Sequence, residues 1–192
     1  MSAIPIIFQD EHLLVVDKPS GLLTVPGRGP EKQDCLINRL LVEYPSARIV
    51  HRLDQPTSGL VVIALSPEAQ RAMGRLFELR QISKSYVAVV SGSLAEEEGE
   101  VDLPLICDWP NRPRQMVDHE QGKSAQTGFR VLERNPLESS CRVALTPVTG
   151  RSHQLRVHML ALGHPILGDQ LYAPDSVREA SPRLLLHARS LA

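Results

Sequence analysis

Residues 51–59 (HRLDQPTSG) place a carboxylate where acid–base or nucleophilic chemistry is possible. Residues 56–59 have a turn composition, and the apolar run 60–65 that follows predicts a buried strand. A carboxylate at the mouth of a buried strand is partly desolvated, so Asp54 needs a cationic neighbour to stay ionised, and His51 and Arg52 are the adjacent candidates. On these residues alone, Asp54 also fits an ordinary loop aspartate that caps a turn.

A second segment, residues 149–165, combines basic and histidine side chains with a helical pattern. It predicts an amphipathic helix over residues 152–162, ended by a glycine. Its first turn follows Thr-Gly-Arg151, which suits an anion such as phosphate. His153 and His158 lack the spacing and the acid of a zinc motif, so both are expected to be hydrogen-bonded or RNA-facing side chains without a metal.

The elements that must position these residues are mostly strands. Apolar runs and alternation predict strands at residues 12–16, 60–65, 86–90, 126–132, 142–145 and 183–191. Helices are predicted at residues 34–43, 67–80 and 152–162, the second with Ser66 as its N-cap. Because several connections are too short for a parallel crossover, an α+β fold is expected, with a mixed, mostly antiparallel sheet and flanking helices.

Composition sets wider limits. The net charge of −1 does not by itself suggest a nucleic-acid binder, but residues 71–84 and 151–192 are locally basic, and the acids gather in a predicted loop at 96–100. The 3 cysteines are far apart, which argues against disulfides and zinc and fits a reducing cytoplasm. Residues 1–5 show no secretory signal, and no apolar run has the length of a membrane span, so a cytoplasmic chain without membrane contact is expected.

The motif at residues 51–59 is similar to the signature of the RluA-type RNA pseudouridine synthases. Three further stretches resemble motifs of that family in the family's order: residues 16–23, residues 84–88 with a Lys-x-Tyr pattern, and residues 150–159, which run on to Asp169. Together they cover residues 12–172, nearly the whole chain. Because four motifs occur in the family's order, Asp54 is expected to be the catalytic residue and not an ordinary turn aspartate.

This resemblance implies a pseudouridine synthase fold with a central catalytic cleft, and a uridine flipped out of a folded RNA loop. Asp54 then acts at the ribose, either as a nucleophile on C1′ or by removing the C2′ proton. The C1′–N1 bond breaks, the uracil rotates, and C5 bonds to C1′ and loses its proton. The family's reaction uses no cofactor and no metal.

Roles for individual side chains also follow from the resemblance. Arg156 is expected to pair with Asp54, and Tyr86 to stack on the uracil with its hydroxyl near C5, unless it is simply an aromatic core residue. Arg52 is expected to fill the space left by the flipped base, unless it only pairs with a local acid. The remaining candidates for contacts with RNA are His51, Arg71, Arg75, Arg112, Arg114 and Arg151.

Residues 105–115 resemble the dual-specificity branch of the family. That resemblance implies action as a monomer on uridine 32 of tRNA anticodon stem-loops and uridine 746 of a 23S rRNA stem-loop. We expect residues 1–192 to form a single catalytic domain. An S4 RNA-binding domain is not expected before the first motif, and the family's C-terminal tail is expected to be missing after residue 192.

Two other functions are compatible with parts of the sequence. One is a non-catalytic RNA-binding protein on the same fold. The other is a hydrolase that uses Ser58 or Asp54 with His51, which is disfavoured because the chain has no Gly-x-Ser-x-Gly elbow.

Overall fold

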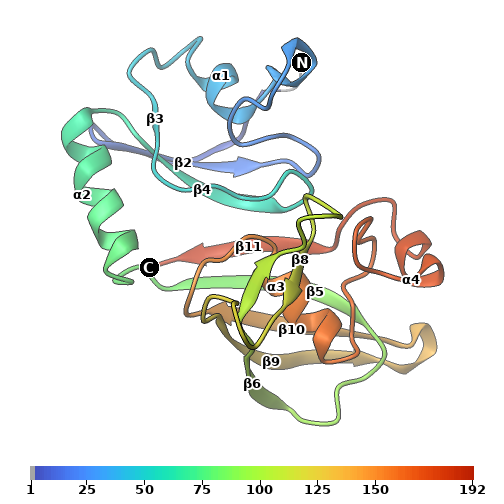
Figure 1. Cartoon of the computed structure of the whole chain (residues 1–192). Helices are drawn as coiled ribbons and strands as arrows, with labels where there is room; N and C mark the ends of the chain where they lie inside the picture. The colour runs from blue at the N-terminus through green and yellow to red at the C-terminus, as the bar shows by residue number, and fades with distance from the viewer. Residues whose placement is uncertain (1–2) are drawn as a thin grey trace. The chain divides into compact units, whose positions relative to one another are not determined.

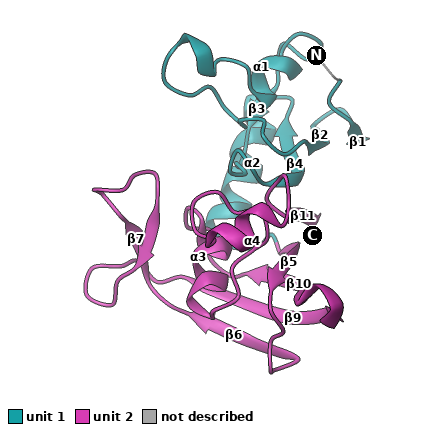
Figure 2. Cartoon of the chain, turned by 90° about the vertical axis from the view of Figure 1, so that its right-hand side faces the viewer, with its two compact units in different colours: residues 1–82, 191–192 teal, residues 83–190 magenta. Residues whose placement is uncertain are grey.

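The computed structural model describes residues 3–192, which divide into two compact units (Figure 2). Unit 1 extends to Ile82 and includes Leu191–Ala192, and unit 2 is Ser83–Ser190. The prediction that residues 1–5 carry no secretory signal falls partly on residues 1–2, which lie outside the described residues. Within residues 3–192, no helix has the length and apolar character needed to cross a membrane.

Unit 1 is built on a small antiparallel sheet with helices beside it (Figure 1). The strands pair in the order β1–β2–β4, and β3 also pairs with β4. Its elements are β1 (Ile6–Gln9), β2 (Leu13–Lys18), the 3-10 helix η1 (Pro30–Lys32), α1 (Leu36–Leu40), β3 (Arg48–Ile49), β4 (Ser58–Ala64) and α2 (Pro67–Glu78).

Local sequence explains the elements that frame Asp54. Strand β2 alternates between partly and fully buried side chains, so that Leu14, Val16 and Lys18 share its inner face. Strand β4 is buried along nearly its whole length, as its continuous apolar run predicted. Helix α2 begins at the predicted cap, where the Ser66 side chain accepts a hydrogen bond from the Ala69 backbone N–H at 3.1 Å.

Unit 2 is built on a longer sheet with the order β11–β5–β10–β9–β6. Its β5–β10, β10–β9 and β9–β6 pairs are antiparallel, and β7 and β8 form a separate hairpin. Its elements are β5 (Lys84–Ser91), β6 (Glu98–Asp102), β7 (Leu105–Cys107), β8 (Gln115–Val117), β9 (Gln126–Asn135), the 3-10 helix η2 (Pro136–Glu138), β10 (Ser140–Pro147), α3 (Gln154–Ala161), α4 (Asp175–Glu179) and β11 (Leu186–Leu191).

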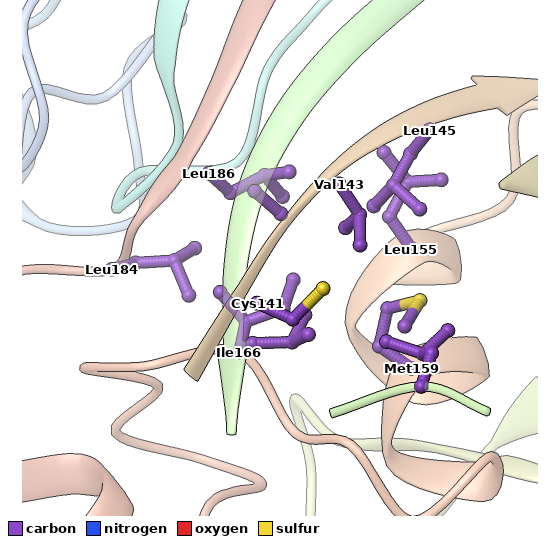
Figure 3. Packing of buried hydrophobic residues seen from close by; sticks show 11 residues of the cluster. Cys141, Val143, Leu145, Leu155, Met159, Ile166, Leu184 and Leu186 are labelled. Atoms are coloured by element: carbon purple, nitrogen blue, oxygen red, sulfur yellow. The ribbon is translucent and has the colours of Figure 1, made fainter. Parts of the chain in front are cut away.

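The core of unit 2 lies between its sheet and α3. Cys141, Val143 and Leu145 alternate along β10 and are fully buried, and Leu155 and Met159 of α3 belong to the same cluster (Figure 3). Every second residue of a strand and every fourth residue of a helix point to the same side, so these residues of β10 and α3 form two apolar surfaces that pack together. This packing fixes α3, the helix that carries Arg156.

The predicted α+β class, with a mostly antiparallel sheet, is confirmed. Two predictions about elements are wrong. The predicted loop at residues 96–100 largely becomes edge strand β6, paired with β9, because extended backbone can add to that edge. The helix predicted at 152–162 begins at Gln154 and is not amphipathic, since residues 154–159 are all buried.

Candidate active site

The loop that carries Asp54 is held by the segment from Lys18 to Thr24. The Thr24 hydroxyl donates to the Leu53 carbonyl at 2.8 Å and accepts from the Leu53 backbone N–H at 3.2 Å. The Ser20 hydroxyl donates to the Pro56 carbonyl at 2.7 Å. Residues on both sides of Asp54 are therefore fixed by side chains of the segment 18–24, while the Asp54 side chain itself is partly exposed.

Gln55, the next residue after Asp54, is bound to the same segment in both directions. Its carbonyl accepts from the Gly21 backbone N–H at 2.9 Å, and its side-chain amide donates to the Gly21 carbonyl at 3.0 Å. Gly21 has a φ of 87°, a conformation that glycine adopts without strain. The turn at Gly21 thus positions the residue that follows Asp54.

Lys18 lies beneath this loop and is fully buried, with 0% of its surface exposed. Its ammonium group donates to the carbonyls of Leu22, Pro19 and Gln55 at 2.6, 3.0 and 3.1 Å. Burial lowers the pKa of Lys18 from 10.5 to about 8, and the negative charge of Asp54 opposes that shift. Lys18 and Asp54 are therefore electrostatically coupled within unit 1.

His51 and Arg52 precede Asp54 but differ in their surroundings. The Nε2 atom of His51 accepts a hydrogen bond from the Val62 backbone N–H at 3.0 Å, and its ring packs 4.6 Å from that of Phe77. A ring nitrogen that accepts a hydrogen bond carries no proton, so this contact favours a neutral His51 that ties the loop to β4 and α2. Arg52 is exposed.

Arg156 lies on α3 in unit 2 and is 2% exposed. Its Nε and Nη2 donate to the carboxylate of Asp169 at 2.8 and 2.6 Å, a two-pronged ion pair with a partner that is 1% exposed. The guanidinium carbon also lies 4.9 Å from the centre of the Tyr172 ring. Asp169 was not predicted as the partner of Arg156. The expected pair of Arg156 with Asp54 joins residues of the two units and stays a prediction.

Backbone geometry explains how Asp169 comes to face Arg156. Gly168 has a φ of 76°, and a Cβ at this position would lie 1.9 Å from the Arg183 carbonyl oxygen. Only glycine allows the chain to pass so close to that carbonyl. Asp169 Oδ1 also accepts backbone N–H groups of Leu171 and Tyr172 at 2.9 and 3.2 Å, which orient the carboxylate.

The start of α3 is organised by Gln154, which is 4% exposed. Its side-chain carbonyl accepts from the Thr149 hydroxyl at 2.6 Å and from the Arg151 backbone N–H at 3.0 Å, and its amide donates to Gln126 and Thr127 at 2.9 Å. The helix was predicted to begin at Ser152. The Gln154 side chain instead binds the backbone N–H of Arg151, so residues 152–153 are not helical and α3 begins at Gln154. The Arg151 side chain is exposed and donates to the Ser124 carbonyl at 3.1 Å.

His158 and His153 both form hydrogen bonds, which is one of the two roles predicted for them. His158 is 0% exposed and lies between the Leu103 carbonyl at 3.0 Å and the Thr127 hydroxyl at 2.9 Å. Because a carbonyl can only accept, Nε2 of His158 carries a proton. Burial lowers the pKa of His158, which favours the neutral ring. His153 Nδ1 lies 2.7 Å from the Tyr172 hydroxyl.

The other predicted residues lie on three elements. Tyr86 is partly buried on β5, where it packs against the unit 2 core. Arg71 and Arg75 are exposed on α2, and Arg71 also donates to Glu68 at 2.9 Å. Arg112 and Arg114 lie in the loop between β7 and β8, with Arg112 exposed.

Sequence comparisons place these motifs among known RNA-modifying proteins. A sequence model of the family described as RNA pseudouridylate synthase matches residues 12–161. The chain is 55% identical over 186 residues to a protein of Yersinia pestis named dual-specificity RNA pseudouridine synthase RluA, covering 97% of this chain and 90% of that one. A protein of the same name from Escherichia coli strain K12 is 56% identical over 186 residues, covering 97% and 84%.

Solved structures agree with the sequence comparisons. Human RNA pseudouridylate synthase domain containing 1 superposes with a TM-score of 0.85 at 32% identity, over 98% of this chain and 78% of that one. Human RNA pseudouridylate synthase domain containing 4 superposes with a TM-score of 0.79 at 28% identity, over 97% and 83%. Similarity in sequence and similarity in fold therefore lead to the same family.

Proposed function

We propose which residues carry the reaction and which uridines are modified by this chain, which belongs to the RNA pseudouridylate synthase family and isomerises uridine to pseudouridine in RNA. The observation that carries the assignment of the catalytic residue is the clamped loop around Asp54. Its neighbours Leu53, Gln55 and Pro56 are each hydrogen-bonded to the segment 18–24. A reacting group needs such rigid support.

In the proposed reaction, Asp54 attacks C1′ of a flipped-out uridine or removes its C2′ proton. The C1′–N1 bond breaks with its electron pair left on N1, and the uracil turns within the site. C5 then bonds to C1′, and in the same step the Asp54–C1′ ester bond breaks on the first route, or the proton held by Asp54 returns to C2′ on the second. C5 gives up its proton and N1 gains one, so that atoms and charge balance. No other reactant is required.

Two residues of unit 2 assist Asp54 in this proposal. Arg156 supplies the positive charge that keeps the Asp54 carboxylate ionised. A guanidinium has five N–H donors, and the hydrogen bonds to the Asp169 carboxylate use two of them. These two bonds hold the Arg156 side chain in one orientation, which supports the proposed role. Tyr86 stacks on the uracil with its hydroxyl at C5.

We propose that contacts with RNA outside the reacting uridine come from the basic residues Arg52, Arg71, Arg75, Arg112, Arg114 and Arg151. Arg52 fills the gap left in the RNA stack, and the others contact phosphates. The rigid, neutral setting of His51 supports a role in shaping the loop, with its predicted contact to RNA made through the exposed part of the ring.

The proposed substrates are the two uridines expected from residues 105–115, one in tRNA anticodon loops and one in a 23S rRNA stem-loop. The names of the relatives from Yersinia pestis and Escherichia coli, which include the term dual-specificity, support two targets for this chain. We further propose that the enzyme acts as a monomer in the cytoplasm.

The hydrolase alternative has less support. Ser58 is 8% exposed at the start of β4, and Nε2 of His51 accepts a backbone hydrogen bond. A serine hydrolase needs an accessible hydroxyl beside a base that can take its proton.

Purified protein with short stem-loop RNAs tests the proposal. We expect wild type to form pseudouridine, and Asp54→Asn to bind the same RNAs with similar affinity but to react at least about a thousandfold more slowly. Asp34→Asn, which changes an exposed acid of the same unit, is the matched control and should react at the wild-type rate. Substantial turnover by Asp54→Asn would refute the assignment.

A further inference from the structure

We propose that Trp109 and Arg112, in the loop between β7 and β8, form a platform on which an unpaired base of the substrate RNA stacks, a base other than the reacting uridine. The inference rests on the proposed function, since it takes RNA to be the substrate. Trp109 is the only tryptophan of the chain, and the reaction described above gives it no role.

The platform stands on an ordered hairpin. Strands β7 and β8 pair antiparallel, and Figure 2 shows the hairpin projecting from the body of unit 2. Within the loop, the Asp108 backbone N–H donates to the Arg114 carbonyl at 2.9 Å and the Asn111 N–H to the Asp108 carbonyl at 3.0 Å. The Asn111 side chain also donates to the Asp108 carboxylate at 3.0 and 3.1 Å. These bonds give the loop a defined shape.

At this loop, a flat aromatic group and a flat cation are held together. Trp109 is 67% exposed, although tryptophan is on average a highly buried residue. Exposure alone is common for single apolar residues and decides nothing. What distinguishes Trp109 is Arg112, whose guanidinium carbon lies 4.0 Å from the ring centre and whose Nε donates to the Trp109 carbonyl at 3.0 Å. The contact orders both side chains at the surface.

Such a pair has the chemistry that recognises an unpaired nucleobase. Bases splayed out of RNA loops stack on aromatic rings and on guanidinium planes, and the positive charge suits the neighbouring phosphates. A folded RNA loop from which a uridine is flipped offers further unpaired bases. The exposed tryptophan beside an arginine therefore fits an RNA loop without requiring a particular sequence.

Contacts within unit 2 connect the hairpin to the surroundings of Arg156. The Gln115 backbone N–H donates to the Tyr172 hydroxyl at 2.8 Å, and the guanidinium carbon of Arg114 lies 5.4 Å from the Tyr172 ring. Arg156 also packs against that ring. The loop end of the hairpin is thus anchored on a residue that also packs against Arg156, so RNA held by this loop lies near Arg156.

Because the chain has 1 tryptophan, its tryptophan fluorescence reports on Trp109 alone. Titration with the anticodon stem-loop RNA should quench this emission. Trp109→Ala should weaken binding about tenfold, and Trp109→Phe, which keeps a flat ring, should restore most of the affinity. Arg112→Lys keeps the positive charge but loses the flat guanidinium group, so its affinity for the RNA should lie between those of Trp109→Ala and Trp109→Phe. Leu137→Ala, which removes an apolar side chain that is 98% exposed elsewhere in unit 2, should bind as wild type does.

Rates of pseudouridine formation separate failure of the platform from failure of the proposed function. The platform predicts that the effect of Trp109→Ala falls on KM rather than on kcat. Unchanged emission and unchanged KM in an enzyme that still forms pseudouridine would overturn the platform and leave the proposed function standing. Quenching with weakened binding, in a protein that forms no pseudouridine, would support the platform and overturn the proposed function. Normal RNA binding by Trp109→Ala together with failure to bind a protein that wild type binds would overturn the platform in favour of a protein partner.

Discussion

At the level of single residues, the loop of Asp54 depends on a buried cation. Lys18 occupies an inner position of β2, on the same face as Leu14 and Val16, and its ammonium group binds three carbonyls. A fully buried lysine is rare and persists only where its donors are satisfied. Here the donors join Pro19 and Leu22 to Gln55, the residue after Asp54, so the same contacts contribute to stability and to the geometry of the loop.

Lys18→Met should lower the free energy of unfolding by about 3 kcal/mol. Each of the three carbonyls loses a donor at about 2 kcal/mol, about 6 kcal/mol together, and removal of the desolvated charge returns roughly 3 kcal/mol. Urea unfolding of both proteins measures the difference. Lys32→Met, at an exposed position, is the control and should stay within about 0.5 kcal/mol of wild type.

The lowered pKa of Lys18 also predicts a pH dependence. Lysine titrates near 10.5 in the unfolded chain and near 8 in the folded protein, so between these values the unfolded state binds more protons. The stability of wild type relative to Lys18→Met should therefore rise from pH 8 to pH 10.5, by up to about 3 kcal/mol, and stay constant below that window. A difference between the two proteins that does not change over this range would contradict a desolvated lysine.

Little of this arrangement could be predicted from the residues around Asp54. Alternation along β2 puts Lys18 inside, but Asp17 and Lys18 precede a proline and have a turn composition, so the predicted strand ended at Val16. The carbonyl contacts from Lys18 to Gln55 join residues far apart in the sequence, and no local pattern indicates them. Recognition of Asp54 came from motif similarity, not from local physics.

Among the elements, α3 differs most from its prediction. The pattern of apolar residues predicted a helix with one polar face, whereas Gln154, Arg156 and His158 are all buried. Their polar atoms are satisfied by side chains and carbonyls from other elements, which a helical pattern cannot predict. Helix α2 and the β9–β10 hairpin were predicted well, because a cap and alternating residues are local signals.

Asp169→Asn tests how far α3 depends on its buried ion pair. Removing one partner leaves the charge of Arg156 buried, which costs about 3–5 kcal/mol. We expect stability to fall by that amount in thermal or urea unfolding. Asp175→Asn, in an exposed pair with Arg178, should change stability by less than about 1 kcal/mol. Equal effects of the two substitutions would contradict a structural role for the Arg156–Asp169 pair.

At the level of the whole molecule, RNA binding does not follow from net charge. The chain carries −1 overall, and composition alone points away from nucleic acid. The fold class could be predicted from the number of strands and the short connections between them. The β7–β8 hairpin could not, because its loop of proline, asparagine and arginine has no strand pattern and its strands are only three residues each.

If phosphates provide much of the affinity, RNA binding should weaken steadily as salt rises. Replacing Arg71 or Arg75 with glutamine should reduce the slope of log K against log salt by about 1 for each phosphate that is no longer neutralised. Filter binding at several salt concentrations measures the slope. Arg134→Gln, at a residue paired with Glu97, should leave it unchanged. A response to salt that is flat in wild type would exclude these arginines as phosphate ligands.

Mapping pseudouridines in the total RNA of a strain that lacks the gene shows whether this chain forms pseudouridine with Asp54. We predict that pseudouridine disappears from the tRNA anticodon loop and from the 23S rRNA stem-loop, returns when the wild-type chain is restored, and stays absent with Asp54→Asn at equal protein levels. Pseudouridine restored at both positions by Asp54→Asn would exclude Asp54 as the catalytic residue.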